Sequence, residues 1–214
     1  MAKETAVARM MERRPLASRS SSWAQWLAAR LMKSQITPNQ ISLLSVAWAI
    51  LGGGLLLWCA GWLAFIATAV CVQLRLLCNL LDGMVAIEGG KSTPSGALFN
   101  EIPDRVSDPL FLVPLGYAAG YSLLGWLAAL LAVLTAYIRV LGGALGQQQD
   151  FGGFLPKQRR MAVLTIALLA AAVEDGLWGT RVSLLAAAII IALGSLATCI
   201  SRTLRIARLL ETPP

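Results

Sequence analysis

The sequence contains no histidine and few acidic residues, and these two absences exclude much of common enzyme chemistry. Without imidazole there is no histidine general base, no Ser-His or Cys-His nucleophile pair and no zinc site that needs histidine. The cysteines lie inside apolar runs and form no C-x-x-C pair, so neither a disulfide framework nor a thiolate metal site is indicated. Any chemistry must therefore use carboxylates, amides, hydroxyls, Lys, Arg or a bound metal. The four cysteines are Cys59, Cys71, Cys78 and Cys199.

Charged residues are scarce, whereas apolar residues are abundant. Of the 214 residues, 14% are charged and 57% are apolar, and the mean hydropathy is +0.68. This composition is typical of a membrane protein rather than of a soluble domain. The 18 Lys and Arg exceed the 11 Asp and Glu, which gives a formal charge of +7. We expect this basic excess to meet anionic lipid, and we expect no nucleic-acid partner.

Six stretches are apolar over roughly the 20 residues that a membrane-spanning helix needs. The fifth is too short to span if it starts at Met161, so we extend it backward to residue 157. The sequence therefore predicts an all-α, polytopic membrane protein with six transmembrane helices. The predicted spans are residues 40–58, 62–81, 97–120, 122–142, 157–174 and 181–200.

The chain before the first span divides into two parts. No apolar core follows the charged residues 1–19 before Trp23, so we expect a disordered or surface-lying segment rather than a cleavable signal peptide. Residues 22–33 place Trp23 and Trp26 at helical spacing, which predicts an amphipathic helix at the membrane interface or one packed on the bundle. The run Thr37-Pro38-Asn39-Gln40 has the pattern of a capped helix start.

These features predict three regions and an orientation. The regions are an N-terminal segment with the interfacial helix, 1–36, a transmembrane domain, 37–200, and a basic tail, 201–214. Because translocation of Lys and Arg is disfavoured, we place both termini in the cytoplasm of a bacterial cell, with the spans in its inner membrane. Only Arg181 is then left on the outer side of the membrane.

Polar residues gather at the end of the second span and in the third. Five of the 11 acidic residues lie between residues 82 and 108. Asn79 and Asp82 are three residues apart, and Arg75 lies one turn earlier, so the three share one helical face. A second polar stripe recurs at every fourth position after a loop of small residues. It consists of Asn100, Asp104 and Asp108.

Because neither polar stripe can face lipid, we expect the two stripes to face each other. Burying several carboxylates together is costly unless cations neutralise them. Oxygen ligands suit Mg²⁺ or Mn²⁺, either of which would also recruit phosphate. Two other interpretations remain open: a transport pathway, or structural ion pairs between the aspartates and nearby arginines. In the second case Asp82 and Asp104 would pair with Arg75, Arg105 or Arg139.

The run Asp82-Gly83-x-x-Ala86, followed by Gly96-x-x-x-Asn100-x-x-x-Asp104, resembles the signature of the CDP-alcohol phosphotransferases. That signature is D-x-x-D-G-x-x-A-R followed by G-x-x-x-D-x-x-x-D. The run Thr37-Pro38-Asn39 is similar to the T-P-N that precedes the first span in this family. The resemblance extends from about residue 23 to about residue 200.

Three positions depart from the family signature. Asn79 and Asn100 stand where the family has aspartate, and Ile87 stands where it has arginine. A paired-metal site would therefore lack two negative charges, and Glu101 and Asp108 are the candidates to supply compensating charge. A second alignment takes Asp104 and Asp108 as the last two carboxylates and places Asn100 at the glycine.

The resemblance implies how the matched residues act. Asp82 and Asp104 would hold Mg²⁺ or Mn²⁺, with Asn79 and Asn100 as neutral ligands, and Asp104 would be the base for the acceptor hydroxyl. It also implies close approach of the nucleotide at three small residues, for which ordinary helix packing is the alternative explanation. These residues are Gly83, Ala86 and Gly96.

Phosphate groups and the acceptor also need cations. An unpaired guanidinium inside a span is costly, so Arg139 is expected to face the site. Arg75 is assigned to the nucleotide, whereas Lys157, Arg159 and Arg105 are assigned to the acceptor or to phosphate. A last group is expected to anchor the protein to anionic lipid instead. It comprises Arg160, Arg202, Arg205 and Arg208.

Four functional hypotheses follow. The first is a phosphatidyltransferase, expected to be a homodimer, that moves a phosphatidyl group from CDP-diacylglycerol to a small alcohol or phosphorylated alcohol and releases CMP. The second reverses the parts, with another CDP-alcohol as donor and diacylglycerol as acceptor. The third is a catalytically weakened relative that binds nucleotide or lipid or supports an assembly. The fourth is a transporter, although the sequence shows no clear inverted repeat.

Overall fold

The computed structural model describes residues 21–59 and 61–211. Within these ranges the chain forms seven α-helices and no strand, which confirms the all-α prediction. The predicted disordered segment at residues 1–19 lies outside the described residues. The helices are α2 (Ser22–Met32), α3 (Pro38–Trp58), α4 (Trp62–Ile87), α5 (Gly96–Ala118), α6 (Ser122–Ala144), α7 (Lys157–Trp178) and α8 (Val182–Glu211).

The start of α3 is fixed by a capping box, as its sequence predicts. The Thr37 hydroxyl accepts from the Gln40 amide at 3.3 Å, and the Gln40 side chain accepts from the Thr37 amide at 2.9 Å. Pro38 occupies the first helical turn, where its missing N–H leaves no helical hydrogen bond unmade. This cap sets where α3 begins and so places Ser42 one turn into the helix.

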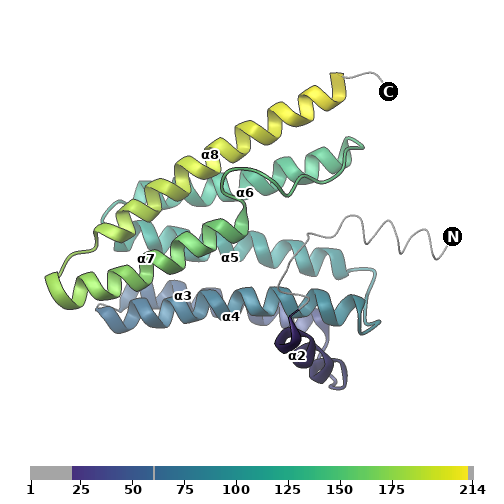
Figure 1. The fold of residues 1–214 in the computed structure, drawn as a ribbon, viewed down its shortest axis with the longest axis horizontal. Helices are drawn as coiled ribbons and strands as arrows, with labels where there is room; N and C mark the ends of the chain where they lie inside the picture. Colours follow the sequence, from purple (N-terminus) through teal and green to yellow (C-terminus); the bar gives the residue numbers. More distant parts are fainter. Residues whose placement is uncertain (1–20, 60, 212–214) are drawn as a thin grey trace.

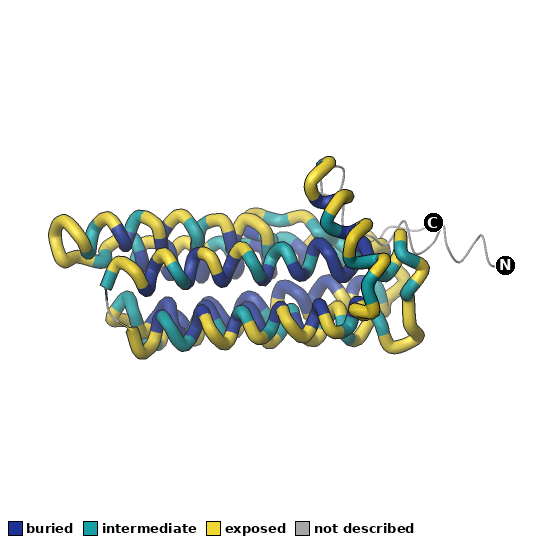
Figure 2. Tube along the Cα trace, turned by 90° about the horizontal axis from the view of Figure 1, so that it is seen from below, coloured by how far each residue is buried: buried dark blue, intermediate teal, exposed yellow. Residues whose placement is uncertain are grey.

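The six long helices α3 to α8 form a ring (Figure 1). Going around it, the neighbours in contact are α3, α5, α6, α8, α7 and α4, and α4 then closes the ring against α3. Buried residues face the inside of this bundle and exposed residues face outward (Figure 2). Many of the buried positions are alanine or glycine, which lets apolar helices pack closely. Buried alanines of the core include Ala49, Ala69, Ala128, Ala132, Ala171 and Ala188.

Five of the described helices are long and apolar enough to cross a membrane: α3, α4, α6, α7 and α8. The backward extension of the fifth span is confirmed, because α7 begins at Lys157. Helix α5 has 23 residues but carries four charged side chains in its first half, so it does not meet the same composition criterion. Helix α8 continues beyond the predicted end of the last span at residue 200 and reaches Glu211.

Helix α2 lies across one end of the bundle, next to α4 (Figure 1). It packs through Ala24 and Ala28, which are fully buried in a cluster with Met84 of α4. Trp23 and Trp26 remain more than half exposed. Helix α2 therefore both packs on the bundle, which was the alternative prediction, and presents its indoles outward.

Gly53 allows α3 and α5 to come into backbone contact. A Cβ atom at Gly53 would lie 2.1 Å from the Leu110 carbonyl oxygen. Pro114 of α5 has no amide hydrogen to donate to that carbonyl, so the helix leaves it open toward α3. We expect Gly53→Ala to lower the free energy of unfolding by about 1–3 kcal/mol, because backbone atoms must move apart.

The measurement is thermal unfolding in detergent, with Gly54→Ala as the matched control. At Gly54 the added methyl group would meet only the ring of the exposed Trp58. Alanine is favoured over glycine by about 1 kcal/mol in a helix at both positions. The difference between the two variants therefore reports the close approach, and equal stabilities would contradict it.

Candidate active site

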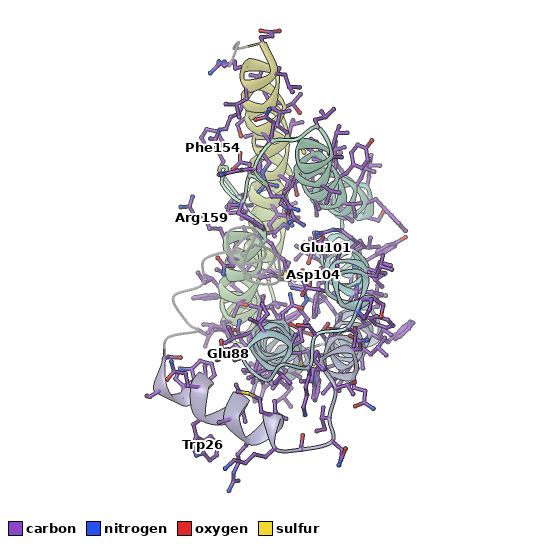
Figure 3. The ribbon with its side chains drawn as sticks, turned by 90° about the vertical axis from the view of Figure 1, so that its right-hand side faces the viewer. Trp26, Glu88, Glu101, Asp104, Phe154 and Arg159 are labelled. Carbon is purple, nitrogen blue, oxygen red and sulfur yellow. The ribbon has the colours of Figure 1, made fainter. Side chains whose placement is uncertain are left out.

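A cavity of about 1050 Å³ opens at the end of the bundle where α2 lies. Its walls come from the start of α3, the last part of α4, the first part of α5, the end of α6 and the start of α7, together with the loops between them. Figure 3 looks at the molecule from this end and shows Glu101 and Asp104 pointing inward. The two polar stripes therefore face each other in the fold, as predicted.

Most of the residues predicted for the site line this cavity. They are Asn79, Asp82, Gly83, Ala86, Gly96, Asn100, Glu101, Asp104, Arg105, Arg139 and Lys157.

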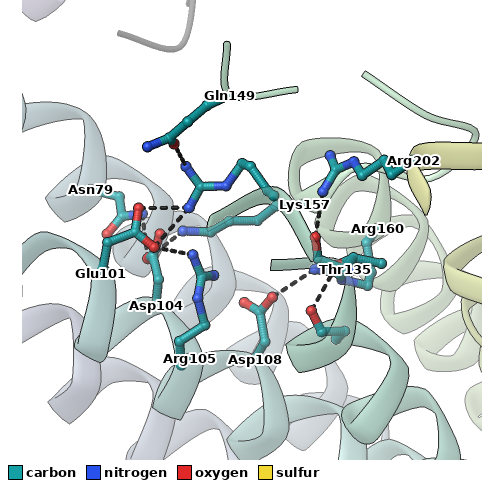
Figure 4. A network of polar contacts seen from close by, with 12 residues as sticks. Asn79, Glu101, Asp104, Arg105, Asp108, Thr135, Gln149, Lys157, Arg160 and Arg202 are labelled. Atoms are coloured by element: carbon teal, nitrogen blue, oxygen red, sulfur yellow. Dashed lines mark hydrogen bonds and ion pairs between the residues drawn. The ribbon is translucent and has the colours of Figure 1, made fainter. Parts of the chain in front are cut away.

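Asp104 is surrounded by donors that all use its Oδ1 atom. The Asn79 amide donates to it at 2.6 Å, and the Arg75 guanidinium at 3.2 Å. The Lys157 ammonium forms an ion pair with the same atom, and Figure 4 shows this arrangement. None of these contacts uses Oδ2, so the second oxygen of Asp104 is the one left for a ligand.

Asp82 lies deeper and is only 3% exposed. Its Oδ2 accepts from the Ser42 hydroxyl at 2.6 Å, whereas its Oδ1 is buried and has no hydrogen-bond partner. The backbone of Gly83 also interacts with this carboxylate. A buried carboxylate oxygen without a donor is costly, and a bound cation would satisfy it.

Three residues predicted for the site do not line the cavity, and the first two form a network beneath its floor. Arg75 is fully buried and pairs with Asp108 Oδ1 at 2.9 Å. The other oxygen of Asp108 pairs with Arg160 at 2.8 Å. The sequence assigned Arg75 to the nucleotide and Asp108 to compensating charge, whereas in the fold neither lines the cavity and each has a buried partner.

The third is Arg159, which lies on the outside of α7 (Figure 3). Residues three apart share a helical face, so Lys157 and Arg160 point inward together while Arg159 does not. Arg160 is 2% exposed and bonds to Asp108 and Ser195. The sequence interpretation exchanged these two neighbours, because it assigned Arg160 to lipid and Arg159 to the site.

Arg202 also departs from its predicted role as a lipid anchor. It is buried and donates to the carbonyl oxygens of Thr135, at 2.6 Å, and Gly152, at 3.0 Å and 2.8 Å. These contacts tie α8 to α6 and to the loop between α6 and α7. The sequence predicts the end of the last span at residue 200 and a basic tail after it, because it does not show these partners.

Glu101 joins two arginines at the cavity wall. Both of its oxygens accept from Arg139, at 2.6 and 2.7 Å, and it also pairs with Arg105 one turn away. Arg139 further donates to Gln149 and stacks over the ring of Phe151. Since its oxygens are occupied by guanidinium groups, Glu101 contributes charge to this wall rather than a free ligand oxygen.

Several cavity residues escaped sequence reasoning, and Ser42, Gln149 and Phe151 are examples. Ser42 lies one turn after the capped start of α3, a position whose spacing from the cap was available as a signal. Gln149 and Phe151 lie in the loop before α7 and carry no recognisable pattern. Only the fold brings this loop against Arg139.

The donor set of the cavity consists of oxygen ligands, as Mg²⁺ and Mn²⁺ prefer. In the described part of the chain, no three carboxylate or thiolate side chains gather closely enough to form a metal site by themselves. The available set is instead two carboxylates, Asp82 and Asp104, with the amide groups of Asn79 and Asn100 beside the cavity. The unpartnered Oδ1 of Asp82 fits a divalent cation.

No family model matches the sequence, but the chain is similar to several curated proteins. It is 29% identical over 155 residues to the inner membrane protein YnbA of Escherichia coli strain K12, covering 72% of each chain. It is 30% identical over 150 residues to the phosphatidylinositol phosphate synthase of Corynebacterium glutamicum, covering 66% of this chain and 67% of that protein. It is 35% identical over 156 residues to the bifunctional IPC transferase and DIPP synthase of Rubrobacter xylanophilus, covering 70% of this chain but 35% of that protein.

Solved structures share the fold. The phosphatidylinositol phosphate synthase of Mycobacterium tuberculosis in complex with manganese and citrate matches with a TM-score of 0.71 at 23% identity, over 86% of this chain and 88% of that one. The same enzyme with CDP-DAG bound also gives a TM-score of 0.71 at 23% identity, over 87% and 94% of the chains.

Proposed function

Because this chain belongs to the CDP-alcohol phosphotransferase family, we propose that it transfers a phosphatidyl group from CDP-diacylglycerol to a small alcohol and releases CMP. The observation that carries the proposal is the cavity itself, where α4 and α5 bring the residues that match the family signature to face one another. The solved neighbour with CDP-DAG bound supports the donor. The relatives named phosphatidylinositol phosphate synthase support an alcohol acceptor.

In this proposal Asp82 and Asp104 hold Mg²⁺ or Mn²⁺, and Asn79 and Asn100 supply neutral oxygen ligands. The manganese in a solved neighbour supports a divalent ion. When bound, the cation neutralises the donor pyrophosphate and stabilises the charge that develops on departing CMP. Ser42 orients Asp82 by donating to Oδ2, which leaves Oδ1 for the metal.

Asp104 is proposed to accept the proton of the acceptor hydroxyl through Oδ2, on the lone pair of that oxygen that the cation does not use. Asn79, Arg75 and Lys157 hold the carboxylate through Oδ1 and fix its direction. The acceptor oxygen then bonds to the phosphatidyl phosphorus, the bond from that phosphorus to the CMP oxygen breaks, and CMP leaves with the electron pair. A carboxylate base agrees with the absence of histidine.

The rest of the cavity is proposed to bind the two substrates. Gly83, Ala86 and Gly96 line it and present no long side chain, which suits close approach of a nucleotide. Arg105 and Arg139, bridged by Glu101, form the wall for the acceptor or its phosphate.

We further propose that α5 crosses the membrane as a sixth span, because its charged side chains face the cavity or the buried network beneath it and its flanking helices shield them. Helix α2 would lie at the interface with Trp23 and Trp26 in the headgroup region. We propose that this end of the bundle and both termini lie on the cytoplasmic side of a bacterial inner membrane, which the basic residues near the cavity support. The relative named an inner membrane protein supports this location, and a homodimer is proposed as the assembly.

The test is CMP release by the purified protein from CDP-diacylglycerol with a panel of alcohols and alcohol phosphates, in the presence of Mg²⁺ or Mn²⁺. We expect release that stops on chelation and in Asp82→Ala, while Asp175→Ala at the opposite end of α7 stays active. CMP release only from other CDP-alcohols with diacylglycerol would favour the reversed reaction. Nucleotide binding without CMP release from any pair would favour a catalytically weakened relative.

A further inference from the structure

Lys157 brings a positive charge into the site, and the inference drawn from it rests on the proposed function. Its ammonium group pairs with Asp104 and its side chain is 12% exposed. The start of α7 is anchored one turn later, where Arg160 bonds to Asp108 and Ser195. The preceding Leu155 amide donates to Thr198 of α8 at 2.9 Å. The position of Lys157 is therefore set by the bundle.

Asp104 has little capacity left for metal ions. Three donors, from Lys157, Asn79 and Arg75, already converge on Oδ1, although a carboxylate oxygen offers about two lone-pair sites. Only Oδ2 can bind a cation, so Asp104 is able to bind one ion but is poorly suited to bridge two.

The free ligand oxygens instead lie on the α4 side. Asp82 Oδ1 is buried and unpartnered, and Asn79 lies one turn earlier on the same helical face. Because the Asn79 amide nitrogen donates to Asp104, its carbonyl oxygen is directed elsewhere and stays available. These atoms and Asp104 Oδ2 form the ligand set for a single ion.

The balance of charges in the site also favours a single bound ion. Together with the network beneath them, Asp82, Asp104 and Asp108 are balanced by Lys157, Arg75 and Arg160, so the connected groups are neutral before any ion binds. One divalent cation then leaves an excess of two positive charges, and a second would double it. We propose that the site binds one divalent cation, held mainly by Asp82, and that the Lys157 ammonium takes the place of a second cation beside Asp104.

The test measures Mn²⁺ binding to the full chain in detergent, without nucleotide, by titration calorimetry and electron paramagnetic resonance. We expect one Mn²⁺ per chain, with the six-line spectrum of an isolated ion. Asp82→Asn should abolish binding at the same concentrations. Two ions in one site would lie roughly 4 Å apart and would give a broadened, coupled spectrum.

The variant that restores the missing charges should regain the second ion. We expect Asn79→Asp/Asn100→Asp/Lys157→Met to bind two Mn²⁺ with the coupled spectrum. Lys157→Met alone should tighten binding of the single ion by about tenfold or more, because a like charge is removed. Lys157→Arg keeps the charge and should retain one ion, and Arg159→Met, on the outer face of the same helix, should match the wild type.

Two ions or none in the wild-type chain would overturn the inference, and so would a folded triple variant that still binds one. If the triple variant does not fold, the Mn²⁺ affinity of Lys157→Met is the deciding measurement. An affinity equal to that of the wild type would overturn the inference. These readouts do not depend on turnover. Absence of CMP release together with one bound Mn²⁺ would reject the proposed function and leave the ion count intact.

Discussion

Replacing Asp104 with asparagine is expected to lower the rate of CMP release by about a thousandfold or more. The substitution removes a proposed metal ligand and the proposed proton acceptor at one position, and a general base alone contributes about 10²- to 10⁴-fold. The side chain keeps its size and its capacity to accept from Asn79, Arg75 and Lys157 through the amide oxygen. The measurement is initial-rate CMP release from CDP-diacylglycerol at saturating metal.

The matched control is Glu88→Gln, the same chemical change at an exposed carboxylate at the end of α4 that does not line the cavity. It should keep the wild-type rate. Unfolding temperatures of both variants show whether a lost rate reflects lost structure. A rate of Asp104→Asn within tenfold of the wild type would remove Asp104 from both proposed roles.

Asp104 and Asp82 were accessible from sequence because their signal is local. Two polar positions three or four apart on a helix must share a face, and a polar face cannot point to lipid. The same rule predicted that Asn79 and Asn100 belong to the site. It does not say how far along a stripe the cavity extends, so Asp108, one turn beyond Asp104, was assigned to the site although it lies beneath the floor.

What the sequence could not provide is the identity of the partner helices. Asp108 is buried because Arg160 of α7 reaches it across 52 residues of chain, and no spacing within α5 reveals this. Ser42 and Gln149 belong to the cavity for the same kind of reason. The sequence assigned Arg202 to a lipid-binding tail, yet its side chain is buried against partners on α6 and in the loop before α7.

The second large effect concerns the buried network beneath the cavity. Asp108 accepts from Arg75 and Arg160, and all three side chains are almost inaccessible to solvent. Removing the one carboxylate that both guanidinium groups share leaves Arg160 with only the Ser195 hydroxyl. We expect Asp108→Leu to lower the free energy of unfolding by about 3–5 kcal/mol, the cost of an uncompensated buried charge.

Denaturant-induced unfolding in detergent measures this loss, and Asp175→Leu is the control. Asp175 pairs with a partly exposed Arg181 at 3.3 Å, so its loss should cost less than about 1 kcal/mol. Asp108→Leu/Arg160→Met should recover most of the stability, because Arg75 keeps Asp104 as a partner and apolar groups of similar size replace the broken pair. If the double variant were less stable than Asp108→Leu, the cost would arise from packing rather than from an unpaired charge.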